Sequence, residues 1–225
     1  MSARLKANAQ AKKYVFSRRG PEIPRDLISE TGLALPGDRD VSVSGRLIEG
    51  MVSVRDAEGT LSIEAAVLEK VSLANCRFSS ILLKDVRLNG CDLANLETRA
   101  LTLVRVEFLN CRMTGLRAGE TDGRDVLIGE GDQRYAQFRY SKFRSAEFDT
   151  CNFAEADFQG TDLSGCIFRK CNLQGAEMSK AKLMDADLRG SMVDGLHLTA
   201  QDIRGAVMDL SQAMTFVPLL GVRIE

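Results

Sequence analysis

The amino-acid sequence predicts an all-β protein whose chain winds into a coil of stacked parallel strands. The prediction rests on a five-residue period in which three kinds of residue each keep one phase. All six cysteines share the first phase: Cys76, Cys91, Cys111, Cys151, Cys166 and Cys171. Eight of the ten phenylalanines lie two residues further on: Phe78, Phe108, Phe138, Phe143, Phe148, Phe153, Phe158 and Phe168. Two residues later again, Gly, Asn and Asp are frequent, so the chain is one long tandem array.

The central position of each unit is large and apolar, and small or apolar residues lie two positions before it. Between Ile63 and Met208 there are 30 such centres, and 26 of them are Leu, Phe, Ile, Met or Val. The exceptions are Thr98, Ala118, Gly123 and Gln133. Because side chains alternate along a strand, both inner positions face one side. Large centres meet small partners, as a densely packed interior of fixed width requires.

Only an extended conformation fits this period. In an α-helix, successive centres would lie about 140° apart and circle the axis. A turn after every fifth residue bends the strand instead, and Gly, Asn and Asp tolerate the positive φ that tight turns often need. With corners of about 90°, four units or about twenty residues close one turn, and stacked turns pair as parallel strands about 4.8 Å apart.

Five units resemble the A(D/N)LXX repeats of the pentapeptide-repeat family. They are ADFQG (156–160), TDLSG (161–165), CNLQG (171–175), AKLMD (181–185) and ADLRG (186–190). The resemblance implies a right-handed quadrilateral parallel β-helix. It implies no shared active site, so no catalytic, cofactor or metal residue is carried over. Some members resemble duplex DNA in shape and acidity and bind type II topoisomerases.

The two ends depart from the repeat and are expected to form short helical caps. Residues 1–40 form a basic capping segment, with possible helices at 3–18 and 24–30. Residues 41–208 form the β-helix, with a degenerate first turn at 41–60 and secure repeats from about Leu61. In residues 209–225, Asp209 and Ser211 offer N-cap oxygens for a helix to about Val217. This last segment is interpreted as a cap or as a dimer interface, through Phe216, Val217, Leu219 and Leu220.

The least regular stretch, residues 119–135, is the candidate interaction site. It contains five acids and two arginines. It is interpreted either as a local bulge in one face or as a protruding acidic loop that contacts a partner. The candidate residues are Glu120, Asp122, Arg124, Asp125 and Arg144, the last stacked on Arg124 from the next turn.

The cysteines and the single histidine do not form a pattern that is typical of an enzyme. Cys91 and Cys111, like Cys151 and Cys171, are expected to stack in neighbouring turns, but without a CxxC spacing they are interpreted as inert core thiols of a cytoplasmic protein. His197, the only histidine, occupies an outward position. No apolar run is long enough to cross a bilayer, so a soluble protein without membrane contact is expected.

The distribution of charged residues distinguishes between two possible functions, a scaffold that binds proteins and a mimic of DNA. The net charge is −1, with +6 in residues 1–20, and residues 61–210 carry 19 basic and 22 acidic residues. DNA mimicry requires a phosphate-like density of negative charge. The sequence therefore favours a non-catalytic scaffold that binds a protein partner over a DNA-mimicking modulator of DNA gyrase or topoisomerase IV. Direct nucleic-acid binding is not expected.

Overall fold

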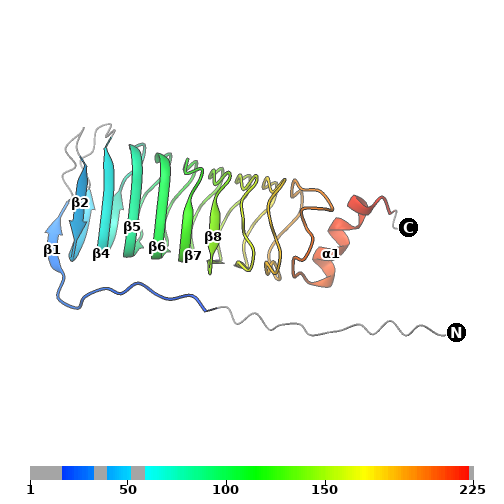
Figure 1. Cartoon of the computed structure of the whole chain (residues 1–225), viewed down its shortest axis with the longest axis horizontal. Helices are drawn as coiled ribbons and strands as arrows, with labels where there is room; N and C mark the ends of the chain where they lie inside the picture. The colour runs from blue at the N-terminus through cyan, green and yellow to red at the C-terminus, as the bar shows by residue number, and fades with distance from the viewer. Residues whose placement is uncertain (1–16, 33–39, 52–58, 223–225) are drawn as a thin grey trace.

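The computed structural model describes residues 17–32, 40–51 and 59–222, and these form one long parallel β-solenoid (Figure 1). One ten-stranded sheet runs in the order β1-β3-β4-β5-β6-β7-β9-β10, with β2 paired to β4 and β8 to β7. The strands are β1 (Ile28–Thr31), β2 (Val41–Ser44), β3 (Arg46–Met51), β4 (Thr60–Ser72), β5 (Arg77–Asn89), β6 (Glu97–Leu109), β7 (Asp122–Gly129), β8 (Lys142–Arg144), β9 (Glu147–Asp149) and β10 (Ile167–Arg169). The helix α1 (Leu210–Phe216) and the 3₁₀ turn η1 (Val217–Leu220) follow.

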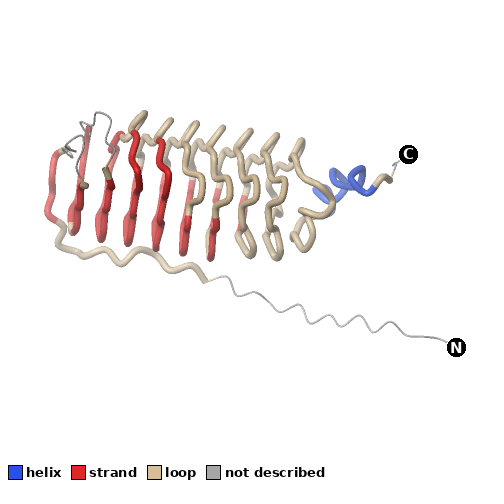
Figure 2. The backbone as a smooth tube through the Cα atoms, turned by 45° about the horizontal axis from the view of Figure 1, so that its top comes forward, coloured by secondary structure: helices blue, strands red, loops and turns tan. Residues whose placement is uncertain are grey.

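The register between neighbouring turns is twenty residues, which confirms the predicted coil of four units per turn. Leu61 pairs with Ile81, and Ile81 with Leu101. The same spacing continues through isolated bridges in the C-terminal half, such as Asp157 with Glu177. Regular strands therefore dominate the first half, and short extended segments separated by turns form the second (Figure 2).

The corners of the coil are backbone turns with positive φ. Eighteen described non-glycine residues adopt this conformation, all at the predicted turn position, and Tyr140 with φ 55° is an example. Such a backbone costs roughly 1–2 kcal/mol per residue. Glycine is needed where the next turn comes close: a Cβ on Gly160 would lie 2.7 Å from the Tyr140 ring. The backbone ladder thus imposes the corner even on residues that disfavour it.

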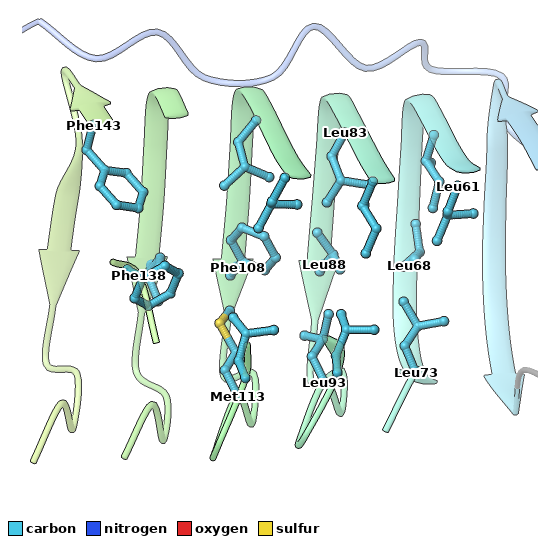
Figure 3. A pocket seen from close by; sticks show the side chains of 17 residues that line it. Leu61, Leu68, Leu73, Leu83, Leu88, Leu93, Phe108, Met113, Phe138 and Phe143 are labelled. Atoms are coloured by element: carbon cyan, nitrogen blue, oxygen red, sulfur yellow. The ribbon is translucent and has the colours of Figure 1, made fainter. Parts of the chain in front are cut away.

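The interior is a column of stacked side chains, as the phase analysis predicted. In the N-terminal half, Leu68, Leu88 and Phe108 point inward from successive turns (Figure 3). They border an apolar cavity of only about 30 Å³, roughly enough for one water molecule. In the C-terminal half, Phe148 and Phe168 stack between turns with ring centroids 4.6 Å apart. This core leaves no room for an organic ligand.

Two of the exceptional centres have physical explanations. A Cβ on Gly123 would lie 2.8 Å from the Phe143 ring, so the missing side chain makes room for the large one in the next turn. Gln133 is fully buried and donates from Nε2 to the Cys111 carbonyl at 3.4 Å. A Cβ on Gly131 would lie 2.2 Å from that Nε2. The predicted exchange of volume therefore also operates between turns.

The predicted helix at residues 24–30 is wrong. Residues 28–31 form β1, which pairs in parallel with β3, and no residue of the described segment 17–32 is helical. Pairing with an existing edge satisfies backbone groups that an isolated two-turn helix would leave open. The predicted helix at 3–18 lies almost entirely outside the described residues.

The degenerate first turn at 41–60 is present in its described part. Val43 of β2 and Ile48 of β3 are buried, with the latter fully inaccessible. β2 keeps the twenty-residue spacing to β4, and β3 keeps it as far as Glu49, after which the register shifts and Met51 pairs with Ser72. The coil therefore begins earlier than the secure repeats, and β1 covers its first edge.

We expect Phe148→Ala or Phe153→Ala to lower the free energy of unfolding by about 3–5 kcal/mol. The rings are 1% and 0% exposed, as predicted from the phase, and each packs edge to face on its neighbours. Urea denaturation measures the change, with the exposed Arg124→Ala as a matched control that should shift stability by less than about 0.5 kcal/mol. Equal effects from both kinds of substitution would contradict the inward phase.

Candidate functional site

The stretch 119–135 forms a regular part of the coil, so both interpretations made from the sequence, a bulge and a protruding loop, are wrong. β7 pairs with β6 and β8 without a register shift, from Thr102 opposite Asp122 to Arg124 opposite Arg144. The irregular sequence fits the regular coil because Gly123 and Gly131 have no side chains and leave space for Phe143 and Gln133.

The five candidate residues are divided among different parts of this turn. Asp122, Arg124 and Arg144 share one face, where Arg144 Nη1 donates to Asp122 Oδ1 at 2.6 Å. Asp125 lies at the corner that follows and is buried, whereas Glu120 lies exposed at the preceding corner. The structure therefore brings three of the five together into a small polar surface.

Charges on the faces are paired between neighbouring turns. Examples are Lys84 with Glu64, Arg77 with Glu97 at 3.1 Å, Arg87 with Glu107 at 2.9 Å, and Arg169 with Glu147 at 3.1 Å. Pairs in which both side chains are exposed, such as Arg77 with Glu97, contribute little stability each. Their effect is to interleave the two signs along the rod, so the described faces show no continuous acidic stripe.

Sequence reasoning missed a surface formed by the N-terminal arm, defined here as residues 17–22. The arm runs along the side of the coil (Figures 1 and 2). Arg18 Nη2 donates to Glu107 Oε1 at 3.0 Å, and the Arg19 and Glu22 backbone N–H groups donate to Asp125 and Asp85. Although burial works against it, hydrogen bonds from Arg105 and from the Glu22 N–H hold the pKa of Asp85 below its ordinary range.

The C-terminal segment packs on the last turn of the coil, through Phe216 and Gln212. Asp209 and Gln212 form a reciprocal capping box at the start of α1. The buried Gln212 side chain also donates from Nε2 to the carbonyls of Leu188 and Ser191 at 2.6 and 2.7 Å. The Leu188 carbonyl also accepts from the Ser191 N–H at 3.1 Å, whereas the Ser191 carbonyl has no further turn to pair with, so the amide replaces the missing strand there.

The four residues proposed for a cap or dimer have different roles. Phe216 is 8% exposed and belongs to the core, so it serves the cap. Val217 is half-buried, whereas Leu219 and Leu220 are 43% and 69% exposed. Leu210 and Met214 of α1 are exposed too. An apolar surface thus remains at this end, formed by a partly different set of residues from the one expected.

Residues 134–169 and 151–190 match the family model "Pentapeptide repeats", with eight copies of the repeat. The twenty-residue register of the structure extends that pattern well beyond the matched residues. Residues 134–190 of the chain therefore consist of pentapeptide repeats.

Solved structures of other repeat proteins are similar at low identity. Trypsin-treated QnrB1, a plasmid-mediated fluoroquinolone resistance protein, is 19% identical, with 87% of this chain and 99% of that chain covered and a TM-score of 0.47. HetL, a pentapeptide-repeat protein involved in heterocyst differentiation regulation from Nostoc sp. strain PCC 7120, is 16% identical, with 80% and 90% covered and a TM-score of 0.30. No curated protein matches the sequence. These likenesses carry no argument about function.

The cysteines satisfy backbone groups of the core. All six are buried. Five donate from Sγ to a carbonyl of the preceding turn, 23 residues earlier, as Cys151 does to Ile128 at 3.1 Å. Thr161 and Ser191 make the same contact with Phe138 and Phe168. A small side chain with a hydrogen-bond donor at this position therefore satisfies a carbonyl of the preceding turn.

Side chains that could bind a metal do not cluster in the described part of the chain. His197 is exposed, as its outward phase predicted. Among residues 17–32, 40–51 and 59–222, no group of three His, Cys, Asp or Glu side chains is placed to hold a metal ion. No helix in the same ranges is long and apolar enough to cross a membrane.

We expect Gln212→Ala to lower the free energy of unfolding by about 1–3 kcal/mol, because it leaves the Ser191 carbonyl without its donor and removes one of the two donors to Leu188. Thermal or urea denaturation measures the loss. Gln201→Ala, an exposed position in the last turn, is the control. The role assigned to the amide is excluded if both variants unfold alike.

We expect native protein at pH 8 to react with a thiol reagent at no more than one of its six cysteines, and at all six in denaturant. Burial raises the pKa of the Cys166 thiol to about 12, so at pH 8 only about one molecule in ten thousand carries the reactive thiolate there. The neighbouring Cys171 thiol, together with burial, likewise raises the pKa of Cys151. Rapid reaction of several native thiols would refute this assignment.

Proposed function

We propose that this pentapeptide-repeat protein is a non-catalytic cytoplasmic scaffold that binds other proteins, and that its C-terminal end carries the main contact surface. Proteins of this repeat class are in general scaffolds. The rod offers flat faces and a filled core, which suit recognition of a protein surface better than binding of a small molecule. The buried thiols support a reducing compartment such as the cytoplasm.

The observation that carries the proposal is the distribution of exposed apolar side chains. Twelve large apolar residues of the described chain are exposed, and eight of them lie between residues 184 and 222. These eight are Met184, Met192, Val207, Leu210, Met214, Leu219, Leu220 and Val222. Concentrated apolar exposure at one end of a molecule marks a site of protein association.

A second copy of the chain is the occupant we favour for this surface. Surfaces that associate by two-fold symmetry need an apolar centre with a polar rim. Leu210 is 80% exposed and Leu220 69%, although they are the first residue of α1 and the last residue of η1 in the segment that packs on the end of the coil. The polar face of Asp122, Arg124 and Arg144 lies further along the rod and would add specificity toward a heterologous partner.

Paired charges count against DNA mimicry. A DNA-like surface presents negative charge at every step along its length, whereas arginines and lysines neutralise the carboxylates here from one turn to the next. For this reason we do not extend the topoisomerase binding of some family members to this chain.

We expect light scattering to show a dimer that Leu210→Asp/Leu220→Asp dissociates, with the dissociation constant raised about 30-fold or more. Neither side chain belongs to the core, so thermal stability of the coil should be kept. Leu82→Asp, at an exposed apolar position of β5, is the matched control.

A monomeric wild type would exclude the second copy and direct the test to other proteins. Cross-linking in source-cell lysate should then give adducts that the double variant loses and the Leu82→Asp control keeps. If neither dimer nor variant-sensitive adduct is found, the C-terminal surface has no binding role and the proposal fails.

A further inference from the structure

The N-terminal arm docks on a column of carboxylates that the twenty-residue period creates along one corner. Asp85, Arg105 and Asp125 occupy this corner in successive turns, and Glu107 lies beside them. We call Asp85, Glu107 and Asp125 the corner column. They are only 5%, 7% and 8% exposed, which is unusual for acidic side chains. Their contacts with the arm account for part of this burial.

The spacing of the column matches an extended chain with three residues per repeat. Asp85 and Asp125 lie two turns apart, about 9.6 Å at the usual strand separation. They accept from the Glu22 and Arg19 N–H groups at 2.8 and 3.1 Å, which are three residues apart. Three residues of polyproline II helix span about 9.3 Å and return to the same side, whereas a β-strand would turn the second donor away.

The sequence of the arm region agrees with this conformation. Pro21 and Pro24 are also three residues apart, and neither has an N–H group to offer. They therefore fall on positions other than those that face the carboxylates. Proline also restricts the free chain to extended conformations, which lowers the entropic cost of docking.

The charge of the corner column favours a basic residue at one position of the arm, which is Arg18. The coil itself supplies two arginines to the three carboxylates: Arg105 donates to both oxygens of Asp85, and Arg87 pairs with Glu107 at 2.9 Å. The remaining negative charge is balanced by Arg18 of the arm, whose Nη2 lies 3.0 Å from Glu107 Oε1. A neutral peptide would leave one uncompensated negative charge among the three buried carboxylates.

The arm is held by these polar contacts rather than by apolar burial. None of residues 17–22 is buried, and Glu22 adds only a long ion pair of 4.0 Å to Arg105. Individual hydrogen bonds to charged groups contribute about 1.5–3 kcal/mol. A segment with this few contacts is open to displacement by a competitor of the same chemistry.

We propose that the corner column is a docking site for an extended, proline-containing peptide segment of a partner protein with the pattern Arg-x-x-Pro, and that the chain's own arm occupies it until such a segment displaces it. The arginine pairs with Glu107, and the N–H groups after the arginine and after the proline donate to Asp125 and Asp85. This inference rests on the proposed scaffold function. It concerns a site separate from the C-terminal surface, so the two are tested independently.

The test uses the full-length chain and a fluorescein-labelled peptide SRRGPEI, which copies residues 17–23. Because the tethered arm competes at an effective concentration in the mM range, wild-type protein should bind the peptide weakly. Arg18→Ala in the protein weakens the arm and should tighten binding of the peptide at least 10-fold by fluorescence anisotropy. Combining it with Asp125→Asn should reverse that gain, whereas Asp157→Asn, a carboxylate paired with Arg139 elsewhere, should not.

Release of the arm is measured separately with a spin label on Ser17→Cys, which the buried native thiols leave as the preferred labelling position. Arg18→Ala should increase the mobility of the label, and Arg18→Glu should increase it further through repulsion by Glu107. An arm that stays immobile in both variants is a permanent part of the fold, and the proposal fails. It fails equally if the arm is released but the peptide does not bind, or binds regardless of Asp125.

Discussion

The hydrogen bond between the backbones of neighbouring turns is the interaction on which this structure depends. Leu93 N–H donates to the Arg112 carbonyl at 2.7 Å, and Arg112 N–H returns a bond to Cys91 at 2.9 Å. Repeated along the coil, such bonds place every residue directly above the one twenty positions earlier. Core stacks, charge pairs and corners all follow from that alignment, including corners that hold Tyr140 or Arg105 at positive φ.

Because the turns are aligned, the volume available to side chains in the interior is limited. The coil has one width, so a large side chain is possible only where a neighbour is small. Gly123 gives room to Phe143, and Gly131 gives room to Gln133. The interior cavity of about 30 Å³ is too small for a substrate, so recognition by this molecule falls to its faces, corners and ends.

Periodic features could be predicted from the sequence, and non-periodic ones could not. The inward phase, the stacked cysteines and the N-cap at Asp209 are local or repeated signals. β1 has no five-residue phase, so its pairing with β3 left no trace in the pattern. Contacts of the arm join residues as far apart as Arg19 and Asp125, and only their three-dimensional stacking shows that Asp85 and Asp125 form one column. The candidate residues between 119 and 144 were chosen because the five-residue pattern is irregular there. That irregularity arises from adjustments in core packing and not from a loop.

Ion pairs between turns also shape how such a sequence changes during evolution. Glu107 pairs with Arg87 one turn before it and with Arg18 of the arm. Replacing one member leaves its partner in need of a new counter-charge, so accepted substitutions should be correlated at a lag of twenty residues rather than between sequence neighbours. A duplication of one complete turn preserves these correlations, whereas a single inserted pentapeptide moves every later charge to a different face. Rods of this kind can therefore change length by whole turns while the pattern of charge pairs on each face is preserved.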